Sequence, residues 1–293
     1  MDALQQSIVD LAPAMAGGLA TEGYYTITGG DDDAILPRDM IALLRKQSFH
    51  LRRQGRFEQS WSERIVSGGV KQRFDKEGVF ACEPDGQDYD VAPDLIVYMS
   101  VLLQTLPVAL NQSFENHTTQ TAVSSEPFNP DLSNSSFNAK LAVTLPGGST
   151  YPLHIDNPEG LASNDTRKLT CILYLNPDYQ VDRGDGGELR ILLGNSDNDK
   201  GNEDAEDAQL RTVDLTPEGG RLVLFWSDEI PHEVLPTAPS FAATPGDNTE
   251  DASLLIDNPL DRYALTIWIP TENYSTIHSE SSSFRSLRDL AFP

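Results

Sequence analysis

The sequence predicts a chain whose second half is an antiparallel β-sandwich or barrel and whose first half is largely helical. Short β-type runs follow one another after residue 136, and turn residues and acidic loops separate them. Regular spacing of short strands without helical periodicity between them is typical of antiparallel sandwiches and barrels rather than parallel βαβ sheets. The runs cover residues 137–145, 168–176, 187–194, 220–227 and 262–270.

The first half carries helical periodicity in three places. Residues 7–27 predict a helix, a glycine break and a short strand. Residues 36–54 predict a second helix, and residues 93–110 predict a third that starts at a Pro-Asp signal. Between these two, residues 68–86 predict a strand or hairpin bounded by glycines. The expected core-facing residues are Met40, Leu43, Leu44 and Leu51 in the second helix and Leu95, Met99, Leu102 and Leu106 in the third.

Charge and cysteine content narrow the class of protein. The 293 residues include 21 Lys and Arg against 45 Asp and Glu, a formal net charge of −24. A field of this sign disfavours nucleic acid and anionic membranes as partners. We find neither a run of about 18 apolar residues, as a membrane span needs, nor a signal peptide. Two cysteines, one inside an apolar run, predict free thiols. We therefore expect a monomer in the cytoplasm or nucleus.

One tripeptide, His-Ile-Asp, raises the question of a metal site. His154 and Asp156 lie two positions apart and share a face if the chain is extended there. In a chain this acidic, a strand end entering a loop explains the tripeptide equally well. His232, which follows an apolar strand, supplies a third candidate ligand. Two histidines and one carboxylate are the facial triad that suits non-haem Fe(II) and leaves coordination positions open.

A second group of residues could receive a carboxylate. Arg262 opens the last strand, and alternation places Thr266 and Trp268 on its face. In the run 168–176 the inward set could include Tyr174. An arginine beside a tyrosine hydroxyl offers a fork of donors plus one neutral donor, which suits a carboxylate.

Four segments together resemble a known enzyme family. HIDNPEG, KLTCILYLNPDYQVDRGDGGELRI, GRLVLFWSDEIPHEVLPT and RYALTIWI are similar to the catalytic core of the oxygen-sensing Egl-nine-type prolyl hydroxylases, within the Fe(II)/2-oxoglutarate dioxygenases. The resemblance covers residues 140–236 and 262–269, and a weaker likeness reaches VKQRFDKEGVF. It implies a double-stranded β-helix (jelly-roll) core with supporting helices. It also implies Fe(II), the cosubstrates 2-oxoglutarate and O2, ascorbate as a further candidate cofactor, and 4-hydroxylation of prolyl residues in a protein, in oxygen sensing.

The resemblance also implies roles for individual residues. His154, Asp156 and His232 would ligate iron, and Arg262 with Tyr174 would hold the distal carboxylate of 2-oxoglutarate. The implied pocket residues of this cosubstrate are Ile172, Leu189, Val234, Trp268 and, close to the metal, Thr266. The implied substrate-binding residues are Asp75 and Arg167, which in the family tie a mobile substrate-covering loop to the core.

Two departures from the family pattern are visible. Leu145 stands where those enzymes carry an active-site tyrosine, in a loop one residue shorter. The interval from His232 to Arg262 is 262 − 232 = 30 positions, longer than the family's, which indicates an insertion. Target choice is expected to have diverged in the segment around Asp75.

We expect one domain over residues 1–293. Its parts are helical support over 1–139 with a substrate flap near 66–82, a jelly-roll core over 140–270, and a C-terminal tail over 271–293. Two polar loops, 195–209 and 239–259, lack core-forming periodicity and are expected to be mobile surface insertions.

Three functions of different kinds stay open. The first is a prolyl 4-hydroxylase acting on a proline-containing protein or peptide. The second is a 2-oxoglutarate oxygenase that acts on another residue or on a small molecule. The third is a metal-binding jelly roll without turnover, against which the complete triad and Arg262 speak. The expected hairpin favours a polypeptide substrate over a small one.

Overall fold

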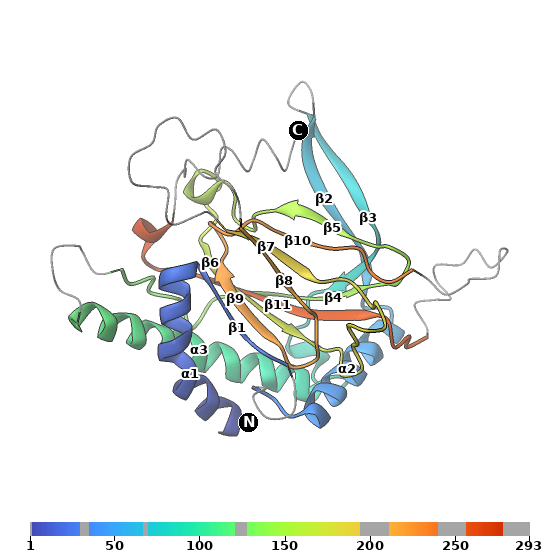
Figure 1. The fold of residues 1–293 in the computed structure, drawn as a ribbon, viewed down its shortest axis with the longest axis horizontal. Coiled ribbons are helices and arrows are strands. Elements are labelled where there is room, and N and C mark those ends of the chain that lie inside the picture. The colour runs from blue at the N-terminus through green and yellow to red at the C-terminus, as the bar shows by residue number, and fades with distance from the viewer. Residues whose placement is uncertain are drawn as a thin grey trace.

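Two antiparallel sheets and three long helices build the structure, a computed structural model that describes residues 2–29, 35–66, 70–120, 128–193, 211–239 and 256–277. The helices cover the outer face of the larger sheet, and the smaller sheet lies on its opposite side (Figure 1). The predicted jelly-roll core with N-terminal helices is therefore confirmed.

The larger sheet has seven strands in the order β1-β9-β6-β11-β4-β3-β2, and the smaller has four in the order β5-β10-β7-β8. All pairings are antiparallel. The bounds are β1 Tyr24–Ile27, β2 Glu58–Val66, β3 Val70–Cys82, β4 Asn138–Thr144, β5 Tyr151–His154, β6 Arg167–Tyr174, β7 Leu189–Leu193, β8 Arg211–Leu215, β9 Leu222–Trp226, β10 His232–Val234 and β11 Arg262–Pro270.

The helices are α1 Asp2–Glu22, α2 Arg38–Arg53 and α3 Pro93–Gln120, with short 3₁₀ turns η1 Gly86–Asp88, η2 Gly160–Ser163 and η3 Tyr274–Thr276. The predicted order of a helix, a glycine break and a strand is confirmed, but α1 continues through Gly17 and Gly18. A side chain at Gly18 would come within 2.7 Å of Tyr25, so this glycine permits close packing of β1 on the helix. The chain turns instead at Gly23, where φ is +76°.

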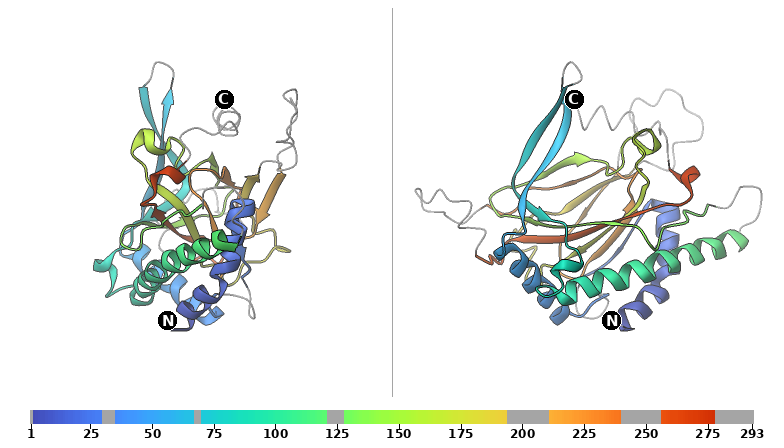
Figure 2. Two further views of the ribbon diagram at one scale, coloured as in Figure 1. Left: turned by 90° about the vertical axis from the view of Figure 1, so that its left-hand side faces the viewer. Right: turned by 180° about the vertical axis from the view of Figure 1, so that it is seen from behind.

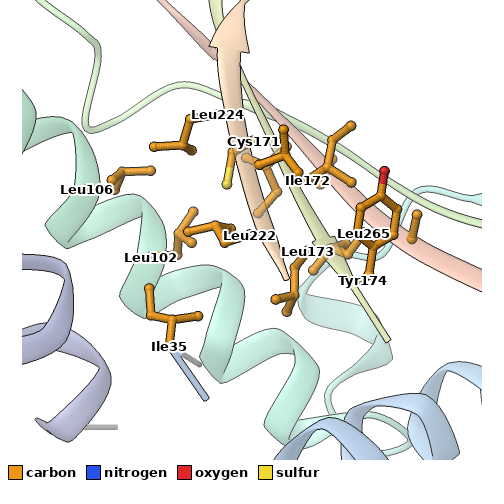
Figure 3. Packing of buried hydrophobic residues seen from close by; sticks show 14 of the residues in the cluster. Ile35, Leu102, Leu106, Cys171, Ile172, Leu173, Tyr174, Leu222, Leu224 and Leu265 are labelled. Carbon is orange, nitrogen blue, oxygen red and sulfur yellow. The ribbon is translucent and has the colours of Figure 1, made fainter. Parts of the chain in front are cut away.

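The core lies between α3 and the larger sheet, where Leu102 and Leu106 face Cys171, Leu222 and Leu224 (Figure 3). All four predicted core residues of α3 are buried. In α2 one prediction is wrong: Leu43 is 37% exposed, and the buried face instead follows Ile41, Leu44, Ser48 and Leu51. Both cysteines are free and buried, as expected.

One helix among the described residues, α3, is long and apolar enough over Pro93–Asn116 to cross a membrane, by length and composition alone. Half of that window is buried inside the fold, against α1 and the sheet (Figure 2). Core helices pass this test as well, so the observation is weak support for a membrane span.

Residues 68–86, predicted as a strand or hairpin, contain the strand β3, which forms a hairpin with β2, a strand that was not predicted (Figure 1). Its register shifts abruptly: Gln59 pairs with Phe80, whereas Trp61 pairs with Asp75. Residues 76–79 of β3 thus lie opposite Ser60 alone, which is a large bulge. The bulge divides the hairpin into a base that joins β4 through residues 79–82 and a projecting hairpin arm, residues 61–66 and 70–75. The predicted flap, 66–82, therefore included four residues of the main sheet.

Most of the two predicted surface insertions lies outside the described residues, as does the tail after residue 277. The end of the second insertion is described, and it is anchored. Arg45 of α2 donates hydrogen bonds to the Asn258 and Asp261 carbonyls and pairs with the Asp257 carboxylate at 3.1 Å. This network holds the chain just before β11.

Candidate active site

The three candidate ligands meet at one end of the smaller sheet. β5 ends at His154 and β10 begins at His232, and these residues are register partners whose ring centroids lie 4.2 Å apart. Asp156 follows β5, and its Oδ1 is 3.6 Å from His154 Nε2 and 3.9 Å from His232 Nε2. All three ligand atoms lie within 4.8 Å of one another. The side chains of Asp156 and His232 are 8% and 6% exposed.

Hydrogen bonds orient each of these side chains. Nδ1 of His154 lies 2.9 Å from the Pro152 carbonyl, and Nδ1 of His232 lies 3.0 Å from the Ile230 carbonyl. A carbonyl can only accept, so each Nδ1 is a protonated nitrogen, and in the neutral imidazole Nε2 then keeps its lone pair. This is the arrangement in which histidines bind metals.

Asp156 is fixed by donors from the larger sheet. Thr170 Oγ1 on β6 and Trp268 Nε1 on β11 donate to its Oδ2 at 2.7 and 2.9 Å. Its other oxygen, Oδ1, is the one directed at the histidines. Burial alone would raise the pKa of Asp156, but its electrostatic interactions with His232 and His154 and the hydrogen bond from Trp268 lower it well below its usual range.

His232 is held neutral at physiological pH. Burial, together with the charge of His154, lowers its pKa from 6.5 to about 4, although Asp156 opposes this shift. Two unprotonated imidazole nitrogens and one ionised carboxylate oxygen therefore converge. This donor set fits a divalent first-row metal such as Fe(II).

At the opposite end of β11 from Trp268, the strand begins with a buried arginine. Arg262, 8% exposed, donates from Nε to the Gly187 carbonyl at 2.6 Å and from Nη2 to the Tyr174 hydroxyl at 3.2 Å. It forms no ion pair with any described residue. A buried guanidinium without a counter-anion is costly, so this end is suited to a ligand carboxylate.

Tyr174 and Gly187 shape this cationic end. Burial raises the pKa of Tyr174, although Arg262 lowers it, so the hydroxyl keeps its proton. Since that hydroxyl accepts from Arg262, its own proton is available to a bound carboxylate. At Gly187 a Cβ would meet Arg262 Cδ at 2.8 Å, and φ is +74°. Only glycine permits this approach without displacing the arginine. The glycine pair in this loop was visible in the sequence, but its contact with Arg262 was not.

Four of the residues predicted to line the cosubstrate pocket form two cross-strand pairs. Ile172 of β6 is the register partner of Thr266 of β11, and Leu189 of β7 is the partner of Val234 of β10. The first pair belongs to the larger sheet and the second to the smaller. The predicted alternation along β6 agrees with the contacts, because Thr170 and Tyr174 reach the site residues while Cys171 and Leu173 pack toward α3 (Figure 3).

The two predicted substrate-binding residues are in separate ion pairs. Asp75, on the hairpin arm, pairs with Arg73 at 3.0 Å. Arg167 binds Asp165, with Nε 2.9 Å from Oδ2, and donates from Nη2 to the Asp156 carbonyl at 2.7 Å. The structure thus places Arg167 against the backbone of a candidate metal ligand and not against Asp75.

A column of stacked side chains, unforeseen from the sequence, connects the hairpin with the histidines. Lys76 Nζ, in the bulge of β3, lies 3.3 Å from the Tyr151 ring centroid, and that ring lies 4.6 Å from the His154 ring. Burial raises the pKa of Tyr151 to about 12. No local pattern announces this column, because it depends on the bulge and on long-range packing.

The loop with Leu145 meets the same bulge. Leu145 N donates to the Gly78 carbonyl at 2.8 Å, and Leu145 O accepts from Thr237 Oγ1 at 2.9 Å. At the position where the family is expected to carry a tyrosine, this chain thus has an aliphatic residue whose backbone joins the bulge of β3 to the segment after β10.

The fold and the site together define a jelly-roll domain with a candidate metal centre and a carboxylate receptor. Residues 139–270 match the family model described as the 2OG-Fe(II) oxygenase superfamily. Every predicted site residue except Asp75 lies inside the matched segment.

Named relatives confirm the resemblance to Egl-nine-type hydroxylases. The chain is 32% identical to Egl nine homolog 1 of Rattus norvegicus over 130 residues, and this aligned segment covers 44% of this chain and 27% of the relative. It is 34% identical over 99 residues to the hypoxia-inducible factor prolyl hydroxylase of Caenorhabditis elegans, covering 33% and 11% of the two chains. The matched segments thus span about a quarter or less of these relatives.

A solved structure shares the fold over most of the chain. It is a prolyl hydroxylase in complex with a hypoxia inducible factor oxygen degradation domain peptide fragment, from Trichoplax adhaerens. The TM-score is 0.60 at 22% identity, with 94% of this chain and 96% of that chain covered. The agreement concerns the fold, including the helices outside the family segment.

Proposed function

We propose that the chain is an Fe(II)- and 2-oxoglutarate-dependent dioxygenase that 4-hydroxylates prolyl residues in a protein substrate. The observation that carries the proposal is the arrangement of three free ligand atoms at one end of a site and a buried arginine at the other. Among the described residues this arginine has no acidic partner. A cosubstrate that chelates a metal at one end and presents a carboxylate at the other fits both ends.

His154, Asp156 and His232 would hold the metal through Nε2, Oδ1 and Nε2. When bound, Fe(II) would supply activation of O2, with oxidative decarboxylation of 2-oxoglutarate to succinate and transfer of one oxygen atom to a C–H bond. The residues of the chain supply the geometry. Thr170 and Trp268 occupy Asp156 Oδ2 and so leave Oδ1 for the metal.

Arg262 and Tyr174 would bind the distal carboxylate of 2-oxoglutarate. The guanidinium supplies charge and the phenol supplies a neutral donor, and burial of both keeps water from competing. Ile172, Leu189 and Val234 would provide the apolar walls along the carbon chain of the cosubstrate.

A polypeptide is the substrate class that the surroundings favour. The hairpin arm projects from the bulge next to Tyr151 and the histidines, where an extended chain could be covered (Figure 1). The relatives are named as prolyl hydroxylases. A role in oxygen sensing is part of the proposal on the same ground.

The test is turnover of 2-oxoglutarate with Fe(II), O2 and a panel of proline-containing peptides, with succinate measured and each peptide examined by mass spectrometry. We expect succinate formation coupled to a gain of one oxygen atom on a proline. Coupled oxidation of a different residue or of a small molecule would replace the prolyl assignment with the alternative oxygenase. Absence of succinate in every mixture would contradict the enzyme itself.

Three further expectations belong to this proposal: a single domain over 1–293, a monomeric state, and a cytoplasmic or nuclear location without nucleic-acid or membrane partners. The mass from light scattering tests the monomer. Limited proteolysis tests the domain, since a single domain should not be divided into two stable fragments near the boundary between residues 1–139 and 140–270.

A further inference from the structure

A groove of about 1020 Å³ lies beside the hairpin base, away from the three candidate ligands. Residues from β2, the turn after β3, α3 and β4 line it. Apolar side chains of α3, including Met99 and Leu103, form part of its lining. Two aromatic side chains that line it are unusually exposed: Trp61 at 46% and Phe137 at 43%. Exposed aromatics that gather around one groove are typical of binding surfaces.

A strand edge opens into this groove. β3 pairs with β4 from Val79–Thr144 to Cys82–Leu141 and then leaves the sheet. β4 continues to Asn138, paired with β11 on one side and with no described strand on the other. Backbone groups of residues 138–140 can therefore accept an added strand, as in peptide recognition by strand addition.

The charge of the groove selects the kind of peptide. Glu58, Glu83 and Asp85 line it, and none forms an ion pair with a described residue. Of the two lining cations, Arg56 is neutralised by Asp88 at 2.7 Å. The other, Lys140, donates to Ser60 at 3.0 Å. The groove thus has three carboxylates and one ammonium group without an ion-pair partner among the described residues, that of Lys140, so its net charge is negative. The net charge of the whole chain, −24, is negative as well.

The groove is continuous with the candidate active site through one strand. Asn138 and Lys140 of β4 are register partners of Trp268 and Thr266 of β11. Trp268 in turn donates to Asp156. A chain lying along the edge of β4 would therefore be only one strand away from the face that carries the candidate metal ligands.

We propose that this groove binds an extended, apolar and basic segment of the polypeptide substrate that flanks the residue to be hydroxylated. The proposal rests on the proposed function, and it adds a second recognition surface to it. Strand addition to residues 138–140 supplies main-chain affinity, Phe137 and Trp61 receive alternate apolar side chains, and the unpaired carboxylates select Lys or Arg.

The probe is a fluorescein-labelled peptide of roughly 16 residues, about 50 Å when extended, with a central proline flanked by alternating Lys and Val. Its companions are a Glu-for-Lys version, a version N-methylated at alternate amides, and a six-residue core around the same proline. Binding is measured by fluorescence anisotropy, and turnover by succinate and mass spectrometry. Because binding needs no turnover, failure of the groove and failure of the hydroxylase can be told apart.

The protein variant is the double substitution Phe137→Ala with Glu83→Lys in the full chain. Its matched control is Tyr274→Ala with Asp182→Lys, which changes an exposed aromatic and an exposed carboxylate elsewhere. We expect the groove variant to bind the long Lys-Val peptide about tenfold more weakly or worse, while the control binds normally. Turnover of the short core should be equal in all three proteins. The Glu and N-methylated peptides should bind poorly even to the wild type.

Equal affinity of the groove variant and the wild type for the long Lys-Val peptide would overturn the proposal. So would equal binding of the N-methylated peptide, since strand addition needs those amides. If the groove variant fails to fold, Glu83→Lys alone, on an exposed turn, decides through the loss of preference for Lys over Glu peptides. Normal binding of the long peptide with no hydroxylation of any peptide would contradict the proposed function and leave the groove standing as a peptide site.

Discussion

Trp268 donates its indole N–H to Asp156 Oδ2 at 2.9 Å, although 112 positions separate the two residues in sequence. Thr170 donates to the same oxygen. Two donors from neighbouring strands of the larger sheet thus hold a carboxylate that follows a strand of the smaller one. This contact links the rigidity of the core to the position of a candidate metal ligand.

Trp268→Phe should weaken metal binding, since it keeps an aromatic ring at this position but removes the indole N–H donor. Loss of such an outer hydrogen bond costs about 10- to 100-fold in metal affinity. Titration with Fe(II) against a competing chelator, without O2, measures the change. Thr170→Ser, which keeps a hydroxyl, is the matched control and should bind metal nearly normally. An unaltered affinity in Trp268→Phe would mean that Asp156 needs no such support.

Arg262→Ala should raise the 2-oxoglutarate requirement severely and leave metal affinity close to that of the wild type. Removing one partner of a buried, charge-assisted pair typically costs about 2–5 kcal/mol. Kinetics of succinate formation against 2-oxoglutarate concentration measure the effect, and Tyr174→Phe should cause a smaller change in the same direction. A normal cosubstrate dependence would place the carboxylate receptor elsewhere.

Gly187→Ala should also raise the 2-oxoglutarate requirement, although less than Arg262→Ala, and it removes no polar group. The added Cβ would meet Arg262 Cδ at 2.8 Å and would sit at a φ of +74°, so the guanidinium must shift. Gly184→Ala, at a φ of +73° but with open space around it, is the control for backbone strain alone. A rise in the KM for 2-oxoglutarate only in Gly187→Ala supports the contact. Equal effects in both variants would attribute the defect to strain.

Replacing residues 62–75 by a short Gly-Ser linker should abolish peptide hydroxylation and leave peptide-independent 2-oxoglutarate turnover. The cut spares Lys76, which stacks on Tyr151, and residues 79–82, which pair with β4. Circular dichroism melting checks that the fold survives. Peptide hydroxylation at the wild-type rate would show that the hairpin arm takes no part in substrate binding.

Asp88→Asn should lower stability in a pH-dependent way. Burial acts to raise the pKa of Asp88, but hydrogen bonds from Arg56 and the Asp85 amide outweigh it and lower the pKa below 3.8. A carboxyl with a lowered folded-state pKa stabilises the fold while it is ionised. The cost of the substitution, about 1–3 kcal/mol at pH 7, should shrink as the pH falls below 3.8. Urea unfolding across this range, with Asp90→Asn as an exposed control, measures it. A pH-independent difference would contradict the ion pair.

Much of the fold and the site follows from local patterns. Alternation along β6 places Thr170 and Tyr174 on one face and Cys171 and Leu173 on the other, because a strand repeats every two residues. The three candidate ligands, the neighbouring pair His154 and Asp156 and the distant His232, were also predicted, and the structure brings them together.

Features that depend on long-range packing were not predictable. The bulge in β3 is a shift of register between β2 and β3 that no local pattern marks, so the column from Lys76 to His154 leaves no sequence signal. The contact between Gly187 and Arg262 joins residues 75 positions apart. Helical spacing predicts that Leu43 is buried, but it is exposed, because the face of α2 that packs on the core follows Ile41, Leu44 and Leu51.

Anaerobic binding of Fe(II) and 2-oxoglutarate to the wild type and to His232→Ala tests whether His154, Asp156 and His232 form a metal centre. We expect one Fe(II) per wild-type chain and metal-dependent binding of 2-oxoglutarate, both measured by equilibrium dialysis. In His232→Ala both should be lost while the melting temperature of the metal-free protein stays close to that of the wild type. Stoichiometric Fe(II) and 2-oxoglutarate binding by His232→Ala, equal to the wild type, would contradict the metal centre on which the proposed function rests.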